Sequence, residues 1–366
     1  MSSIGRRLAA VGLSIALAGG LGAAPGGVSM ATATTPTIAQ LIGQKMVVRM
    51  AGTTPSASLL GRIRRGEVGG VILFGSNITT ATALRTLTKT LHAAAVAGGQ
   101  PRLLIAVDQE GGSIKRIPWI PPTLSPPQMG AINSRATARS QGAATGAALR
   151  DLGIDVDLAP VADVPTTTAS FMYQDGRTWT FDAARTAALS TSFALGLRDD
   201  GVIPTMKHFP GIGAATKNTD TNLVRIYSTA AQLAPGLLPY RSAVADHLPL
   251  VMLSNATYPA YDTIHGAGWA PAIVRTLLRH DLGFTGATIT DSLDGTAVTR
   301  NMPVRSLAAA AASAGTDMIL TTGSEAATAA VYQFLVDRAT SGAILRATLD
   351  ASWARILALK ATLAAP

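Results

Sequence analysis

The sequence predicts a single (β/α)₈ barrel, and three observations support this fold class. Eight short, nearly continuous apolar runs occur between residues 44 and 320, and such runs are typical of parallel strands buried on both faces. Segments of helical periodicity separate these runs. No Gly/Ser-rich linker and no change of composition divides the chain after residue 37. Eight alternations of strand and helix over about 280 residues are what such a barrel requires.

The predicted elements follow one another in regular order. The strand candidates are residues 44–50, 68–74, 103–107, 156–161, 202–207, 250–253, 287–290 and 317–320. The clearest helix candidates are residues 83–97, 136–152, 183–199, 270–282 and 307–314. An open doubly wound sheet is the alternative, but it needs a Gly-rich nucleotide turn after its first strand, and residues 49–53 do not form one.

The N-terminal segment is typical of a secretory signal peptide. Arg6 and Arg7 precede an apolar run over residues 8–21, and small residues near positions 29–33 suit signal peptidase. The alternative is a membrane anchor, but the run of about 14 residues is shorter than the ~20 that span a bilayer. We therefore expect a cleaved signal over residues 1–33, a barrel domain over residues 34–366, and a secreted protein without a stable membrane span.

Composition limits the chemistry and the partners of the chain. The absence of cysteine excludes disulfides, thiol nucleophiles and lipid anchors on cysteine. A net charge of +9 favours association with anionic polymers, and for an exported chain these are cell-wall polymers. Nucleic acid is the rival partner, but the basic residues are scattered, are not interleaved with aromatic residues and form no known binding motif. We therefore expect no nucleic-acid partner.

Strongly polar residues follow five of the eight strand candidates. They are Asp108, Asp163, the pair Lys207–His208, Asn255 and Asp291. The carboxyl ends of barrel strands form the rim that carries the active site, so we expect these side chains to converge there. Any one of them alone is also explained as a strand-end cap or a rim salt bridge. The whole set instead predicts a site.

The residue types at this rim favour the hydrolysis of glycosides. The five histidines are spread along the chain, and no grouping of His, Asp or Glu has the spacing of a metal site. Neither a G-x-S-x-G motif nor a cofactor motif is present. Carboxylates, one lysine and arginines remain. A glycosidase needs one carboxylate as nucleophile, one proton donor and polar groups that hold hydroxyls. We therefore expect a carbohydrate substrate, no cofactor and no metal.

Three motifs carry a resemblance to a known family. They are A-V-D-Q-E-G-G at residues 106–112, K-H-F-P-G at residues 207–211 and I-T-D-S-L at residues 289–293. In this order they resemble glycoside hydrolase family 3, and most of all its single-domain N-acetyl-β-glucosaminidases, which act on peptidoglycan fragments. The resemblance extends from about residue 38 to residue 359, and it implies a TIM barrel.

The resemblance also implies roles for individual residues. Asp291 matches the catalytic nucleophile, which forms a covalent glycosyl-enzyme and retains the anomeric configuration. Lys207 and His208 match residues that bind sugar hydroxyls beside the reacting centre. Asp108 matches a carboxylate that accepts hydrogen bonds from hydroxyls at the far edge of the ring.

Two arginines match substrate-binding positions of the family. Arg116 ends the G-G-x-x-x-R part of the first motif. Arg177, within G-R-T-W, resembles the arginine of G-x-R-S-[FY], with one residue fewer between the glycine and the arginine. A rim ion pair is the alternative explanation for Arg177.

The sequence departs from the family at the acid/base residue. The usual enzymes carry K-H-F-P-G-H-G followed by D-S-H, whose last histidine is the general acid/base. A gapless alignment places Ile212, Asn218 and Asp220 at the first histidine, the aspartate and the acid/base histidine. The N-T-D sequence resembles an actinobacterial branch of the family that lacks the Asp-His dyad. Asp220 then becomes the candidate acid, although its reference pKa of ~3.9 must be raised by burial or by Asp291. The alternative is a solvated loop residue.

The resulting hypothesis is a secreted, cell-wall-associated, monomeric and retaining glycosidase. It releases terminal N-acetyl-β-glucosamine from peptidoglycan-type fragments, with Asp291 and Asp220 as catalytic residues. One alternative is a catalytically weak or inactive wall-glycan-binding protein on the same barrel. Another is a hydrolase of a different β-glycoside.

Overall fold

A computed structural model describes residues 35–363 of the chain. Contacts divide the chain into residues 1–35 and residues 36–366, and the second unit is the one described below. The predicted signal segment, residues 1–33, lies outside the described residues. No helix within the described part is long and apolar enough to span a bilayer.

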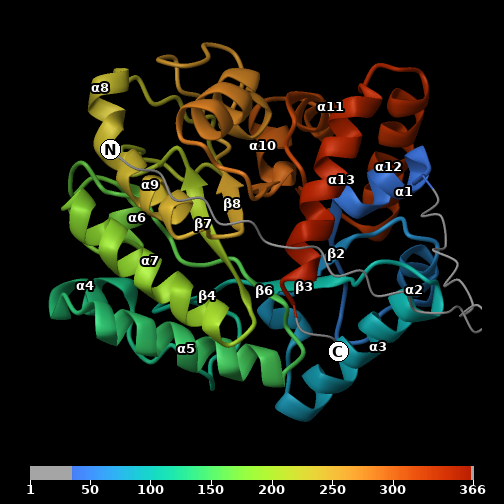
Figure 1. The fold of residues 1–366 in the computed structure, drawn as a ribbon, viewed down its shortest axis with the longest axis horizontal. Helices are drawn as coiled ribbons and strands as arrows, with labels where there is room; N and C mark the ends of the chain where they lie inside the picture. The colour runs from blue at the N-terminus through green and yellow to red at the C-terminus, as the bar shows by residue number, and fades with distance from the viewer. Residues whose placement is uncertain (1–34, 364–366) are drawn as a thin grey trace, which may run out of the picture. The chain divides into compact units, whose positions relative to one another are not determined.

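Eight parallel strands form one sheet in the order β10-β1-β2-β3-β6-β7-β8-β9 (Figure 1). The strands are β1 (Met46–Arg49), β2 (Gly70–Ile72), β3 (Leu104–Val107), β6 (Val156–Asp157), β7 (Ile203–Phe209), β8 (Leu250–Leu253), β9 (Ala287–Thr290) and β10 (Ile319–Thr321). The two edges of this sheet meet where Met318, just before β10, bonds with the backbone of β9: its N–H donates to Thr288 O (2.8 Å) and its O accepts from Thr290 N–H (3.0 Å). The sheet therefore closes, and the predicted (β/α)₈ barrel is confirmed.

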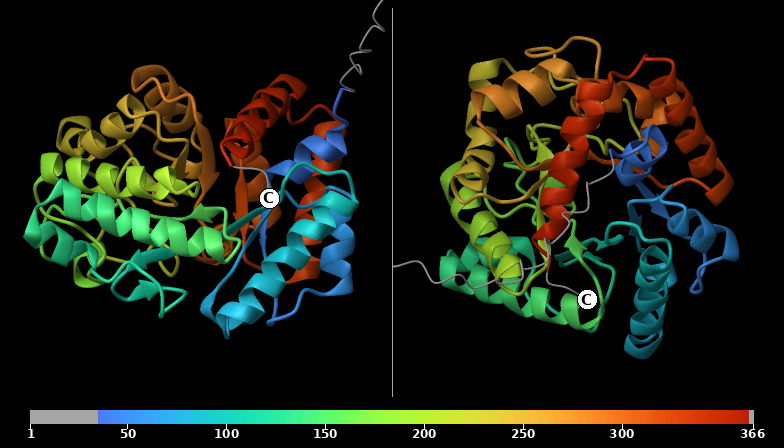
Figure 2. Two further views of the ribbon diagram at one scale, coloured as in Figure 1. Left: turned by 60° about the horizontal axis from the view of Figure 1, so that its bottom comes forward. Right: turned by 45° about the vertical axis from the view of Figure 1, so that its right-hand side comes forward.

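Helices surround the strands on all sides, as the two views of Figure 2 show. Those before β7 are α1 (Ile38–Lys45), α2 (Ala57–Arg64), α3 (Ala81–Ala97), α4 (Pro126–Ile132), α5 (Arg135–Asp151), α6 (Phe171–Gln174) and α7 (Ala183–Asp199). Those after β7 are α8 (Ala230–Leu233), α9 (Leu238–Ala245), α10 (Leu293–Thr299), α11 (Val304–Ala314), α12 (Glu325–Thr340) and α13 (Arg346–Ala361). The 3₁₀ helices are η1 (Gly75–Asn77), η2 (Ala234–Leu237) and η3 (Ala267–Trp269), and η4 (Ala272–Asp281) is a π-helix. A small hairpin, β4 (Gln109–Gly111) with β5 (Ile114–Lys115), follows β3.

Alternation along each strand separates the barrel interior from the layer beneath the helices. In β3, Leu104 and Ala106 belong to the interior cluster, whereas Ile105 and Val107 belong to the cluster that packs against the helices. Successive side chains of a strand point to opposite faces, so both faces of each strand are apolar. Burying one such aliphatic side chain stabilises the fold by ~1.5–3 kcal/mol. Because both faces of each strand are buried, the strand sequences are continuous apolar runs.

The last helix closes one end of the barrel. Ile356 and Leu359 of α13 belong to the interior cluster. Lys360 Nζ donates to Gln44 Oε1 (2.6 Å) and to Gly69 O (3.0 Å), which precede β1 and β2. Burial lowers the pKa of Lys360 to about 7. Since α13 occupies the amino ends of the strands, an open cavity is left to the carboxyl ends.

Most predicted strands differ from the observed ones by one or more residues at an end, and two of these differences have a clear cause. Residues 44 and 45 belong to α1, because Thr37 and Gln40 form a capping box that starts this helix and its buried face continues to Lys45. The predicted strand 156–161 shortens to β6, because Pro160 has no N–H for the ladder. In contrast, β7 extends beyond its predicted end to Phe209.

Candidate active site

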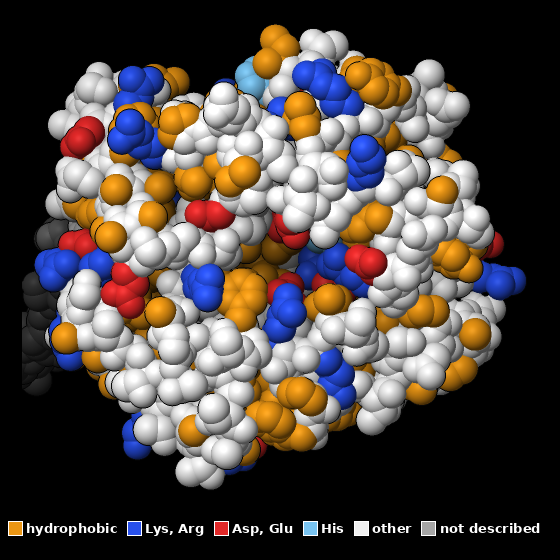
Figure 3. All heavy atoms as spheres, turned by 180° about the vertical axis from the view of Figure 1, so that it is seen from behind, with side chains coloured by type: hydrophobic (Ala, Val, Ile, Leu, Met, Phe, Trp, Pro, Cys, Tyr) orange, Lys and Arg blue, Asp and Glu red, His pale blue; other side chains and the backbone are white. Residues whose placement is uncertain are grey.

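Loops at the carboxyl ends of the strands enclose a cavity of about 230 Å³ that opens on the face seen in Figure 3. There, basic, acidic and hydrophobic side chains gather around a hollow. The polar residues that line the cavity include Asp108, Glu110, Arg116, Asp175, Arg177, Lys207, His208, Asn218, Asp220, Asp291, Ser292 and Thr322. All seven predicted site residues are therefore brought together in one cavity.

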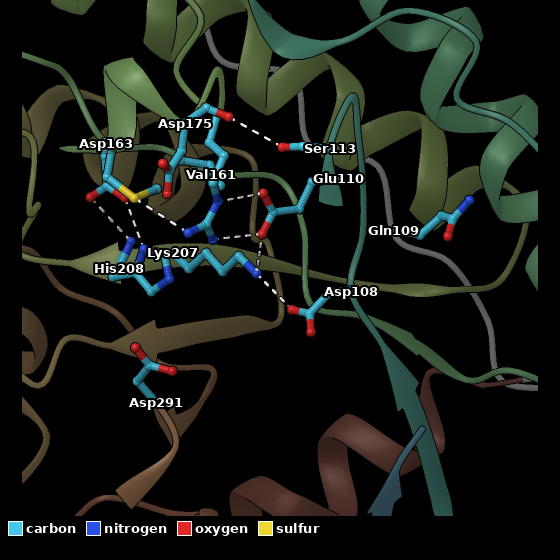
Figure 4. A network of polar contacts seen from close by, with 12 residues as sticks. Asp108, Gln109, Glu110, Ser113, Val161, Asp163, Asp175, Lys207, His208 and Asp291 are labelled. Atoms are coloured by element: carbon cyan, nitrogen blue, oxygen red, sulfur yellow. Dashed lines mark hydrogen bonds and ion pairs between the residues drawn. The ribbon is translucent and has the colours of Figure 1, made fainter. Parts of the chain in front are cut away.

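A buried network of ion pairs forms one wall of this cavity. Lys207 Nζ lies 2.8 Å from Asp108 Oδ1 and 2.6 Å from Glu110 Oε1. Arg177 donates two hydrogen bonds to Glu110, from Nε to Oε2 (2.9 Å) and from Nη2 to Oε1 (2.8 Å). Arg116 Nη2 reaches Asp108 Oδ2 at 3.2 Å. Figure 4 shows the Lys207 side chain extending between the carboxylates of Glu110 and Asp108.

The network fixes the charge of its members. Burial alone would raise the pKa of Asp108, but Lys207 and Arg116 outweigh it and hold this pKa at about 2. Burial opposes the charge of Lys207, but Asp108 and Glu110 raise its pKa above the usual value. At neutral pH, Asp108 is therefore an acceptor and Lys207 a donor for whatever occupies the cavity.

Glu110 stabilises the fold as well as the site. Its side chain is 1% exposed, and it faces Lys207 and Arg177, which are 2% and 16% exposed. Removing one partner of a buried ion pair typically costs about 3–5 kcal/mol. We expect Glu110→Gln to lower the free energy of unfolding by this amount in denaturant titrations. Asp151→Asn, which affects the exposed pair with Arg85, should cost at most ~1 kcal/mol. Equal losses would show that the Glu110 network contributes no special stability.

His208 is oriented by a buried carboxylate behind it. His208 Nδ1 lies 2.8 Å from Asp163 Oδ2, and Asp163 is fully buried. A hydrogen on Nδ1 would be donated to this oxygen, and that tautomer leaves Nε2 for the cavity. Asp163 Oδ1 also accepts the N–H of Ile212 (2.7 Å), at the start of the segment that leads to Asp220. One carboxylate therefore positions the imidazole and the start of that segment.

Asp291 follows β9 and is only partly exposed in the cavity. Its Oδ1 accepts the N–H of Ser292 (2.7 Å), which fixes the side-chain orientation. The Ser292 hydroxyl lies 2.8 Å from the Thr322 hydroxyl, which joins the ends of β9 and β10. None of the ion pairs found within residues 35–363 includes Asp291, so no cation there neutralises its carboxylate directly.

Asp220 lies in the segment after β7 and lines the same cavity as Asp291. Its backbone N–H donates to Asn218 Oδ1 (2.8 Å), and its carbonyl packs so closely on Gly295 of α10 that a Cβ there would lie 2.3 Å from it. Repulsion from Asp291, and then partial burial, raise the pKa of Asp220 to about 6. Since the residue as a whole is exposed, solvent screens part of this repulsion. The carboxyl nevertheless keeps its proton to a higher pH than an ordinary aspartate.

The sequence rule places site residues directly after the strands. It predicts most of the residues that line the cavity, but it misses three features. Glu110 lies three residues beyond the end of β3, and its link to Arg177 spans 67 positions of sequence. The ion pair considered as the alternative for Arg177 does exist, but with this buried glutamate inside the cavity. Asn255 does not line the cavity, because its Nδ2–H donates inward to Ser292 O (2.7 Å). Asp163 supports His208 from behind.

The chemistry of the cavity differs from that of a larger groove. This groove, of about 390 Å³ and lined among others by Phe181, Pro210 and Leu233, has no charged side chain in its wall. Within residues 35–363, no cluster of three His, Cys, Asp or Glu residues is arranged to hold a metal ion. The cavity combines three cations fixed by ion pairs, Lys207, Arg116 and Arg177, with an ionised acceptor and two carboxyl groups of unlike environment. Such a set can bind a polyhydroxylated molecule and transfer protons to it.

Comparisons with known proteins agree with this arrangement. Residues 33–359 match the glycosyl hydrolase family 3 N terminal domain. The chain is 32% identical to an uncharacterized secreted glycosyl hydrolase of Arthroderma benhamiae, over 88% of this chain and 93% of that protein. It is 30% identical to a beta-hexosaminidase of Alkalilimnicola ehrlichii, over 80% of this chain and 84% of that protein.

Two solved structures share the fold along most of the chain. A family 3 beta-N-acetylglucosaminidase of Paenibacillus superposes with a TM-score of 0.86 at 29% identity, covering 90% of this chain and 63% of that protein. A beta-N-acetylhexosaminidase of Beutenbergia cavernae superposes with a TM-score of 0.82 at 29% identity, covering 89% of this chain and 99% of that protein. Because the family match spans nearly the whole chain beyond its N-terminal segment, the protein belongs to glycosyl hydrolase family 3 and is a glycosidase.

Proposed function

We propose that the protein is a retaining β-N-acetylglucosaminidase that releases terminal N-acetyl-β-glucosamine from peptidoglycan-type fragments. The observation that carries this proposal is the pair Asp291 and Asp220 in one cavity, where the first raises the pKa of the second to about 6. A retaining glycosidase needs one carboxylate nucleophile and one carboxyl group that still holds a proton near neutral pH. The hexosaminidase names of its relatives support the choice of sugar.

In the proposed mechanism, the two carboxyl groups divide the chemistry between them. Asp291 attacks the anomeric carbon and forms a glycosyl ester, while Asp220 protonates the departing glycosidic oxygen. Asp220 then removes a proton from water, which hydrolyses the ester with overall retention. The enzyme needs no cofactor for these steps.

The remaining cavity residues hold the sugar. Asp108, with its pKa at about 2, accepts hydrogen bonds from hydroxyls at the far edge of the ring. Lys207 and His208 bind the hydroxyls nearer the reacting centre, and Arg116 and Arg177 complete the polar wall. Because these groups are already fixed by ion pairs, they need little reorganisation when the sugar enters.

The proposed setting is the cell wall of the producing organism. The N-terminal segment has the pattern of a signal peptide. Without Arg6 and Arg7 of that segment the net charge is 9 − 2 = +7, which still favours association with anionic wall polymers. The relative from Arthroderma benhamiae is described as secreted. We propose a secreted monomer that works on soluble wall fragments.

The decisive experiment is hydrolysis of 4-nitrophenyl N-acetyl-β-glucosaminide by the purified protein, with the β-glucoside as the matched substrate. We expect turnover of the first, the β-anomer as its initial product by NMR, and much weaker turnover of the second. Preference for the glucoside would indicate a hydrolase of another β-glycoside. Sugar binding without turnover of either substrate would instead identify a wall-glycan-binding protein.

The pH dependence of kcat/KM on a disaccharide, whose leaving alcohol needs a proton, tests the role of Asp220 directly. A general acid acts in its protonated form, so activity should fall as the pH rises through the pKa of about 6. We expect Asp220→Asn to remove this falling limb. Asp175→Asn, which changes another exposed carboxyl group lining the cavity, should leave the limb at the same pH. A limb that survives in Asp220→Asn would assign the acid to another residue.

A further inference from the structure

Arg49 lies at the edge of the catalytic cavity and has no part in the proposed mechanism. It is the last residue of β1, on the end of the barrel that carries the site, and its side chain is exposed. Its guanidinium carbon lies 5.8 Å from the centroid of the Phe74 ring, and the Phe74 ring lines the cavity. The guanidinium of Arg116 lies 5.6 Å from the same centroid. Two arginines therefore flank one aromatic ring at the cavity mouth.

Only one of these two guanidinium groups has its charge balanced. Arg116 pairs with Asp108, whose pKa of about 2 keeps it ionised. Within residues 35–363, no ion pair or hydrogen bond to the Arg49 guanidinium is found. The mouth of the cavity therefore presents one uncompensated positive charge outside the ion-pair network that holds the sugar.

The backbone around Arg49 and Phe74 is held in place. Asn77, which is 3% exposed, accepts the Phe74 N–H at Oδ1 (2.8 Å). The same side chain donates through Nδ2 to Met50 O (3.2 Å) and Gly52 O (2.6 Å), in the turn that follows Arg49. Arg49 also pairs in register with Ile72 of β2. The charge is therefore presented from a fixed frame rather than from a free loop.

We propose that Arg49 binds a carboxylate on the leaving group of the substrate. The inference rests on the proposed function, because a wall disaccharide that places N-acetylglucosamine in the cavity leaves its second residue at the mouth. That second residue, N-acetylmuramic acid, carries a lactyl carboxylate, or peptide carboxylates when a stem peptide is attached. A guanidinium offers planar donors that match a carboxylate, and stacking on Phe74 limits the entropy lost when it binds.

Three substrates test whether a carboxylate on the leaving group is recognised, and whether it is the lactyl or the peptide carboxylate. Chitobiose carries a neutral leaving group. The β-1,4-linked disaccharide of N-acetylglucosamine and N-acetylmuramic acid carries the lactyl carboxylate. In the third substrate the lactyl group is joined through an amide bond to L-alanine, so that the free carboxylate is the one of the alanine. We expect Arg49→Met to lower kcat/KM about 5- to 20-fold on the acidic substrate that the wild type prefers, as the loss of a charge-assisted hydrogen bond implies. Its kcat/KM on chitobiose should change less than about 2-fold, as for a surface substitution that makes no contact with this substrate. Which acidic substrate responds identifies the source of the carboxylate.

The control variant is Arg305→Met. Arg305 is also exposed and stacked on a phenylalanine, Phe334 (5.3 Å), but Phe334, unlike Phe74, does not line the cavity. It should leave the ratio of acidic to neutral kcat/KM unchanged. Raised salt should weaken the preference of the wild type for the acidic substrate but not that of Arg49→Met. Equal effects of Arg49→Met on all three substrates, or the same selectivity change in Arg305→Met, would overturn the inference.

Failure of the proposed function has a different signature from failure of this inference. If the wild type cleaves none of the three disaccharides, the hydrolase proposal fails, and calorimetric affinities for the same ligands test Arg49 instead. Selective loss of affinity for an acidic disaccharide in Arg49→Met would still support the inference. Uniform affinities in the variant, or no binding by the wild type, would overturn it.

Discussion

Asp291→Asn is expected to abolish measurable turnover on every glycoside while leaving the fold intact. The asparagine keeps an Oδ1 that can still accept the Ser292 N–H, now 2.7 Å away, so the loop after β9 retains its geometry. It cannot form the glycosyl ester, so the covalent route is lost. Losses on the order of 10⁴–10⁶ in kcat are typical when a nucleophile or its essential partner is removed. Steady-state kinetics and the thermal midpoint measure the two effects.

The matched control for this variant is Asp281→Asn. Asp281 is 48% exposed at the end of η4 and pairs only with the neighbouring His280 among the described residues. The same chemical change there should alter turnover less than about 2-fold, as is usual for surface substitutions. Activity of Asp291→Asn within tenfold of the wild type would remove Asp291 from the role of nucleophile.

Asp220→Ala is expected to separate substrates by the quality of their leaving group. Disaccharides, whose leaving alcohol needs a proton, should slow by ~10²–10⁴ because general acid assistance is lost. Aryl glycosides should lose far less in the first step, because a nitrophenolate departs without a proton. Their second step still needs a base, so the glycosyl-enzyme on Asp291 should accumulate. Mass spectrometry of the quenched protein would detect this added mass.

Azide gives the sharper test of the same residue. In Asp220→Ala no carboxylate at position 220 repels the azide anion. Azide should therefore attack the glycosyl-enzyme and restore turnover of aryl glycosides. Its product should be the β-glycosyl azide, because attack comes from the face opposite the Asp291 ester. Asp175→Ala, at another cavity carboxyl group, should slow both substrate classes equally and give no azide product. Small and equal losses in Asp220→Ala, without an azide effect, would reject Asp220 as the acid.

Most of the fold was predictable because barrel strands are buried on both faces. The run at 250–253 coincides with β8, and the run at 287–290 coincides with β9. The first strand was placed too early because α1 runs directly into β1 and carries the apolar pair Leu41 and Ile42 near its end. Hydrophobic burial looks the same in a short helix and a short strand, so the capping residue Thr37 was the better signal there.

The candidate site was predictable only as far as strand ends determine position. That rule located Asp108, Lys207 and Asp291, since the residues after parallel strands share one rim. It gives no direction for a side chain, so it could not tell that Asn255 turns inward to Ser292. Nor could it find the pairing of Glu110 with Arg177, which depends on two loops meeting in space.

The repulsion between Asp291 and Asp220 has a consequence for the timing of the reaction. In the proposed mechanism, Asp291 loses its negative charge when it forms an ester with the sugar, and the largest cause of the raised pKa of Asp220 disappears with it. The affinity of Asp220 for a proton then drops just after it has given one away. The residue is thus prepared to act as a base in the second half of the cycle, and hydrolysis of the ester restores the charge that makes it an acid again. In this mechanism the charge of Asp291 is lost when the ester forms and regained when it is hydrolysed, and this change returns Asp220 to its protonated form for the next turnover.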